Sequence, residues 1–184
     1  MKTLKITAKD IKKSGSYWSD YVGKEDVSNY DGHIEIEGGL GYVRFAGYIR
    51  ATGRIFAEAG SGIKAGWGIK AGEGIKAGSG IEAGSGIKAG EGIKAGWGIK
   101  AGSGIEAGLI ISCNLSLAIG YRIFAGLALW RKEVTDEEKT ITCGKLENGE
   151  VCYGILKEIG MPDEKEATNP KEITIDGAVY ILKS

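Results

Sequence analysis

The sequence predicts a mainly β protein built as a single solenoid of short stacked coils, and three observations support this prediction. The first is a block of 24 residues, Gly60 to Ala83, that returns almost unchanged as Gly84 to Ala107. The second is a six-residue unit within each block, Gly-Ile-(Lys/Glu)-Ala-Gly-X. The third is the composition, since 32 glycines with only 2 prolines under a strict period argue against a disordered linker. In a repeat this short, each unit folds only against its neighbours.

Residues 1–30 are expected to form an N-terminal cap. They combine a candidate strand at 4–7 with an aromatic and polar segment at 16–21, which includes Trp18. The ends of a solenoid expose unpaired strand edges, which invite aggregation unless other residues cover them. We therefore expect this segment to cover the first coil.

Residues 31–131 are expected to form the solenoid itself. Aliphatic residues recur at a regular spacing that begins upstream of the repeated block. The spacing is eight residues between Ile55 and Ile63 and then six residues as far as Leu129. The two extra residues within 57–60 predict a bulge or a wider corner. In each unit Ile and Ala share the inward face of a short strand, the charged residue between them points outward, and the glycines turn the chain.

The charge pattern favours 18 residues per coil and hence a three-sided prism. With that register Lys64, Glu82 and Lys100 stack with alternating sign, whereas a period of 12 stacks only lysines in this column. Opposite charges on neighbouring strands stabilise a sheet by roughly 0.2–1 kcal/mol, and like charges destabilise it. A period of 18 also places Lys70 beside Lys88, so periods of 12 and 24 stay open as alternatives.

Residues 132–184 are expected to form a C-terminal cap of mixed α and β structure. Asn148-Gly149 is a strong turn signal and predicts a β-hairpin. A short helix is expected at 155–159, before a glycine and a proline. Residues 172–182 are expected to form a pair of strands around Asp176-Gly177, which supplies the terminal strand of the chain.

The composition argues against several classes of protein. Lys plus Arg equals Asp plus Glu at 24 each, so no direct nucleic-acid binding is expected. Neither a membrane span nor a secretory signal is expected, because lysines interrupt the N-terminal apolar residues and no other apolar stretch is long enough. Three cysteines without paired spacing indicate free thiols and a reducing cytoplasm.

No catalytic, cofactor or metal site is expected. The single histidine, His33, is expected to be structural or to lie on the surface rather than to act as a base. Cys143 and Cys152 flank the expected hairpin, but a zinc site needs about four ligands and the chain has no second cysteine pair. The Gly-x-Gly triplets lack the Gly-Lys-Ser/Thr ending of a phosphate-binding loop.

The variable position of the six-residue unit is the expected contact surface. It holds Ser, Glu or Trp, which indicates that it faces outward, and its two tryptophans are five units apart and so are expected on different sides. Exposed tryptophans are over-represented in binding hot spots, although each could instead pack on lysine stems or on a cap. The candidate protein contacts are Trp67, Trp97, Glu73, Glu91, Lys70, Lys94 and Trp18.

The tandem Gly-Ile-Lys-Ala-Gly and Gly-Ile-Glu-Ala-Gly units, introduced by His33 to Gly39, resemble small repeat proteins scattered through bacterial genomes and prophages. The resemblance covers about residues 31–110. Some phage-borne proteins of this kind inhibit host defence, and anti-CRISPR proteins are among them, so the resemblance implies an inhibitor that docks on a host protein complex. The unit is also superficially similar to that of hexapeptide acyltransferases, but here a charged residue follows Ile where that family has a small one.

The leading hypothesis is therefore a cytoplasmic, non-enzymatic β-solenoid that binds a protein partner, with a host defence complex as the partner class. The first alternative is a self-assembling scaffold, and homo-oligomerisation stays open. An acyltransferase ranks last, because its only candidate base is His33.

Overall fold

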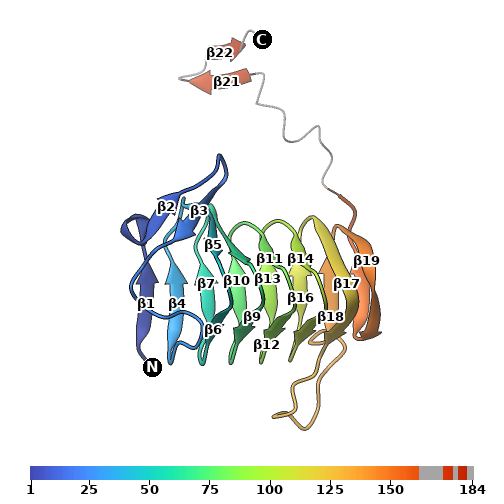
Figure 1. Ribbon diagram of the computed structural model, residues 1–184. Helices are drawn as coiled ribbons and strands as arrows, with labels where there is room; N and C mark the ends of the chain where they lie inside the picture. The colour runs from blue at the N-terminus through green and yellow to red at the C-terminus, as the bar shows by residue number, and fades with distance from the viewer. Residues whose placement is uncertain (162–171, 176–177, 182–184) are drawn as a thin grey trace.

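The computed structural model describes residues 1–161, 172–175 and 178–181, and the chain forms a parallel β-solenoid of about five turns (Figure 1). The strand pairing gives the solenoid three faces. Face one contains β1 (Thr3–Ile6), β4 (His33–Ile36), β7 (Ile55–Ala57), β10 (Ile75–Ala77), β13 (Ile93–Ala95), β16 (Ile111–Cys113), β18 (Thr140–Cys143) and β20 (Ile155–Glu158). Face two contains β3 (Trp18–Tyr21), β5 (Gly41–Phe45), β8 (Ser61–Ala65), β11 (Ile81–Ala83), β14 (Ile99–Ala101) and the first halves of β17 (Ser116–Ala125) and β19 (Lys145–Tyr153). Face three contains β6 (Ile49–Ala51), β9 (Ile69–Ala71), β12 (Ile87–Ala89), β15 (Ile105–Ala107) and the second halves of β17 and β19.

The register confirms 18 residues per coil through the repeated block. Ile81 pairs with Ile63 on one side and with Ile99 on the other, 18 residues away in each direction. Nearer the start the step is 20, since Ile55 pairs with Ile75. The two additional residues form the wider corner that the sequence predicts, where the Ser61 amide donates to the Glu58 carbonyl at 3.0 Å and Gly60 has a φ of +78°.

The core is a stack of isoleucine and alanine ladders inside the prism. In each three-residue strand of the repeat the first and third side chains are buried and the central one is intermediate or exposed. Because isoleucine is β-branched, it favours the extended backbone and packs well against the same residue on the next strand. The charged residues are therefore left on the three outer faces.

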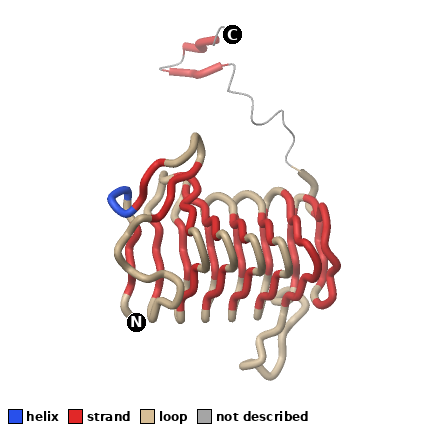
Figure 2. Tube along the Cα trace, viewed as in Figure 1, coloured by secondary structure: helices blue, strands red, loops and turns tan. Residues whose placement is uncertain are grey.

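The N-terminal segment covers part of the first coil. Strand β2 (Ile11–Lys13) pairs antiparallel with β3 at the edge of face two, and a single 3-10 turn, η1 (Ala8–Asp10), precedes it. On face three, the Arg50 amide donates to the Val27 carbonyl, and Tyr30 forms an isolated bridge to Ala51. Strands β1 and β3 also join the parallel sheets, so the solenoid takes in residues of this segment (Figure 2).

Three expectations for the C-terminal part are wrong. Asn148-Gly149 forms no hairpin: it lies inside β19, where Gly149 with a φ of +106° lets the strand bend from face two to face three. The described residues contain no α-helix, and the segment expected to be helical contains β20, which pairs with β18. Leu129 lies outside the core on a loop, because Ile141 takes the next core position beside Ile111.

The expected strands near the C-terminus are confirmed for the residues that the structure describes. Strand β21 (Glu172–Ile175) pairs antiparallel with β22 (Ala178–Ile181). The turn expected at Asp176-Gly177, and Leu182 at the end of the expected strand, lie outside the described residues.

Candidate protein-contact surfaces

The variable positions of the repeat lie at the three corners of the prism. The first corner joins face one to face two and carries Trp97; the second joins face two to face three and carries Trp67. The third corner joins face three to face one and carries Glu73 and Glu91. The two tryptophans therefore lie on different corners, as the register implies.

At the second corner Trp67 is 58% exposed and rests against an aromatic neighbour. Its ring meets Tyr48 edge-on, with 5.1 Å between the ring centroids. The Arg50 guanidinium in turn lies 3.7 Å from the centre of the Tyr48 ring. This stack fixes the orientation of Tyr48 and Arg50 and leaves much of the indole in solvent. Lys70 lies exposed beside Arg50 on face three.

At the first corner Trp97 and Trp18 line one shallow groove. Trp97 is 54% exposed, and its amide donates to the Ser79 carbonyl at 3.1 Å. The groove measures about 590 Å³ and runs between this corner and the N-terminal hairpin, which contributes Tyr17 and Trp18. The Lys64 ammonium lies 5.8 Å from the Trp18 ring. Two of the predicted contacts that are far apart in the chain are thus brought together.

The third corner brings together three more of the predicted contacts, Glu73, Glu91 and Lys94. They line a groove of about 530 Å³ on face one together with Phe56 and Ile110. The seven predicted contacts thus fall into three groups, one for each corner, and do not form a single surface.

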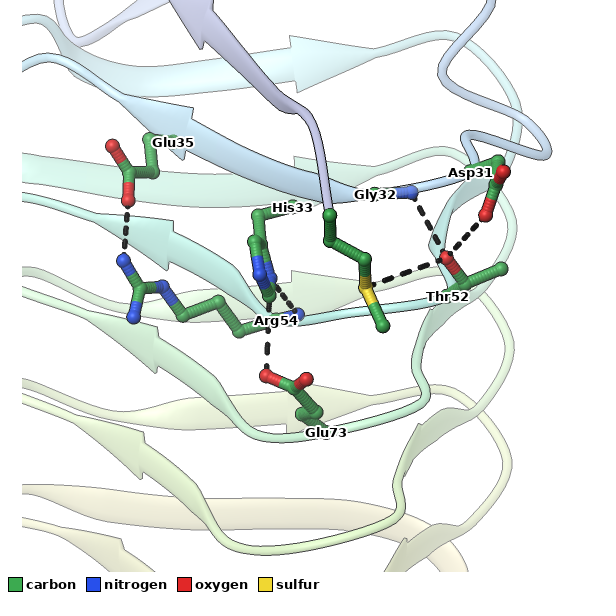
Figure 3. A network of polar contacts seen from close by, with 8 residues as sticks. Asp31, Gly32, His33, Glu35, Thr52, Arg54 and Glu73 are labelled. Atoms are coloured by element: carbon green, nitrogen blue, oxygen red, sulfur yellow. Dashed lines mark hydrogen bonds and ion pairs between the residues drawn. The ribbon is translucent and has the colours of Figure 1, made fainter.

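The histidine lies in a polar network at the first coils (Figure 3). Its Nδ1 accepts the Arg54 amide hydrogen at 3.0 Å, and a Glu73 carboxylate oxygen lies 3.8 Å from the same nitrogen. At 3.8 Å the contact with Glu73 is too long for a hydrogen bond. Arg54 also pairs with Glu35 at 2.6 Å. His33 therefore ties β4 to the start of β7.

A loop at 126–139 adds an apolar element that the repeat pattern does not predict. Leu129 is 94% exposed and Trp130 is 64% exposed. The Trp130 indole donates to the Gly90 carbonyl at 3.4 Å, and Arg131 forms an ion pair with Glu138. The loop is thereby fastened to the third corner. The only signal for it in the sequence is the replacement of the Gly-Ile unit by Leu-Ala-Leu-Trp after Gly126.

Two of the three cysteines, Cys113 and Cys143, are buried. Burial raises the pKa of Cys113 to about 12, with a smaller effect from neighbouring Cys143. Burial also raises the pKa of Cys143, and Glu158 adds to the effect. Cys152 is exposed. Among the described residues no group of three His, Cys, Asp or Glu side chains is close enough to hold a metal ion.

No family model, curated protein or solved structure matches this chain. In the described part of the chain, no helix has the length and apolar character that crossing a membrane requires.

Proposed function

We propose that this chain is a non-catalytic protein-binding module whose solenoid presents tryptophans and charged residues to a partner protein. The observation that carries the proposal is the exposure of three tryptophans, Trp67, Trp97 and Trp130, at 58%, 54% and 64%. Tryptophan is seldom left in solvent, and it is enriched among the residues that dominate binding energy at protein interfaces.

The position of these side chains supports the proposal. On the next two coils, Ser85 and Ser103 lie at the second-corner position equivalent to that of Trp67. The fold therefore accepts a small residue at this position. A large indole at that position adds apolar surface that the core does not need. Since ladders of hydrogen bonds and a close-packed core hold the coils, the partner would meet a surface that is already ordered, which lowers the entropy cost of binding.

The partner class to test first is a host protein complex, because the repeat resembles those of phage-borne inhibitors. The test is affinity capture from a bacterial lysate with the immobilised full chain, followed by titration of the captured protein against variants. We expect Trp67→Ala, Trp97→Ala or Trp130→Ala to weaken binding at least tenfold, since hot-spot truncations cost about 2 kcal/mol or more.

Ser103→Ala is the matched control, because it lies on the same corner as Trp67 and removes no aromatic surface. It should bind as the unmodified protein does, and far-ultraviolet circular dichroism should be the same for all variants. A captured protein that binds every tryptophan variant with unchanged affinity, or no capture by a folded chain, would contradict the proposal.

A further inference from the structure

Face three carries a row of positive charges across three neighbouring coils. Arg50 pairs in register with Lys70, and Lys70 with Lys88. Adjacent strands are about 4.8 Å apart, so the row spans roughly 10 Å. Within the described residues neither Arg50 nor Lys70 forms an ion pair, whereas Lys88 contacts Glu106 on the next coil at 2.5 Å.

Face two shows the opposite arrangement. There Arg44 pairs with Asp20, and Lys64 with Glu82 at 2.6 Å. Like charges on neighbouring strands destabilise a sheet, and on face two the chain places carboxylates where they relieve the repulsion. On face three the first two cations are left without such relief in the part of the chain that the structure describes, as are Lys76 and Lys94 on face one. The row on face three is longer by one cation, which favours an anion supplied by another molecule there.

The row of cations lies along an apolar groove. The groove measures about 400 Å³, and Tyr48, Phe124 and the cationic residues Arg50, Lys70, Lys88 and Arg122 line it. Glu106 also lines it and is paired with Lys88. The Arg50 guanidinium lies over the Tyr48 ring, and Trp67 meets Tyr48 edge-on. A ligand for this groove therefore combines carboxylates with apolar side chains.

We propose that face three binds a short acidic segment of the partner polypeptide, with its carboxylates on Arg50 and Lys70 and its apolar side chains against Tyr48 and Trp67. This inference rests on the proposed function, because it names the surface and the chemistry of the partner.

The charges at both ends of the row favour a peptide over a nucleic acid. Glu106 follows Lys88 on the next coil, and Glu150 lies in register beside Arg122 near the last coil. At the other end Asp26 precedes Val27, whose carbonyl accepts the Arg50 amide. A polyphosphate chain that extends past the three cations would meet these carboxylates, whereas a segment with two or three acidic residues fits between them.

The test uses a short fluorescein-labelled peptide of alternating glutamate and leucine, titrated into the full chain by fluorescence anisotropy. We expect saturable binding that weakens with added salt. The double variant Arg50→Gln, Lys70→Gln should weaken it at least roughly tenfold, since bonds to charged groups are the stronger ones. A double variant with the same loss of charge on the other two faces, Lys76→Gln, Lys100→Gln, should leave binding unchanged.

Each other outcome overturns the inference. These outcomes are no binding of the peptide, equal weakening by both double variants, equal binding of a peptide with glutamine in place of glutamate, or tighter binding of a single-stranded DNA oligonucleotide through Arg50 and Lys70. Failure of this inference can be distinguished from failure of the proposed function. If a captured partner no longer binds the tryptophan variants but still binds the Arg50→Gln, Lys70→Gln variant, the protein-binding function is supported. The proposal of an acidic segment is then wrong.

Discussion

At the residue scale, the corner glycines differ in how much room surrounds them. A Cβ added at Gly66 would lie 2.1 Å from the Ala46 carbonyl oxygen of the preceding coil, whereas one added at Gly47 would meet nothing within 4 Å. We expect Gly66→Ala to lower the free energy of unfolding by about 1–3 kcal/mol, because the backbone of one coil must move away from the next. Gly47→Ala, on the same corner, should raise it by about 0.4–1 kcal/mol through the unfolded state.

Urea unfolding monitored by circular dichroism checks this pair, and equal shifts of the midpoint in both variants would show that coil contact does not explain the glycines. The sequence predicts the inward residues well at this scale, because the pattern of Ile and Ala fixes which side chains point into the prism. It does not predict that Trp67 rests on Tyr48. That contact depends on the 20-residue spacing of the early coils, which places Tyr48, a residue outside the repeat, beside Trp67.

At the scale of elements, the stacking of charged strands makes a specific contribution on face two. Glu82 lies between Lys64 and Lys100 in the register of β8, β11 and β14. Glu82→Lys places three lysines side by side, next to Arg44. We expect the free energy of unfolding to fall by about 1 kcal/mol, since the pair is partly exposed and exposed ion pairs contribute little.

Glu82→Gln separates the two effects in that variant, because it removes the attraction without adding repulsion. Its loss of stability should be smaller, and the difference between the two variants should shrink in high salt as the charges are screened. If the two variants unfold alike at every salt concentration, stacked charge does not contribute to the stability of face two.

The elements of the repeat were predictable, whereas the turn expected at Asn148-Gly149 and the helix expected at 155–159 were wrong, for a physical reason. Each three-residue strand follows from its own residues and from a neighbour of the same sequence. The segments around Asn148-Gly149 and 155–159 carry local signals for a turn and a helix, but β17 and β18 offer them open strand edges. Pairing with those edges outweighs the local preference, as tertiary context often does for strands. The loop at 126–139 breaks the period and so has no counterpart in it.

At the scale of the whole molecule, coils that contact only their neighbours should be removable one at a time. Deletion of residues 75–92 takes out one complete coil of 18 and leaves Ile93 in the register position of Ile75 beside Ile55. We expect a shorter protein that still unfolds in one cooperative transition, with every later strand on its original face. Deletion of residues 75–98 takes out 24 and moves each later strand to a different face.

Labels on one face distinguish these two results. Cys152 on β19 is exposed, whereas Cys113 and Cys143 are buried. Burial also raises the pKa of Cys113 to about 12, which keeps that thiol unreactive. Spin labels should therefore react at Cys152 and at the cysteine of a Lys70→Cys variant. Both labels lie on face three, and the 18-residue deletion should shorten the distance between them by one strand spacing, about 5 Å. The 24-residue deletion should give a different distance distribution, because β19 is rotated about the axis of the solenoid. Identical distance distributions for the two deletions would mean that the 18-residue coil does not determine which face a strand lies on. The assignment of Arg50, Lys70 and Lys88 to one row would then be wrong as well.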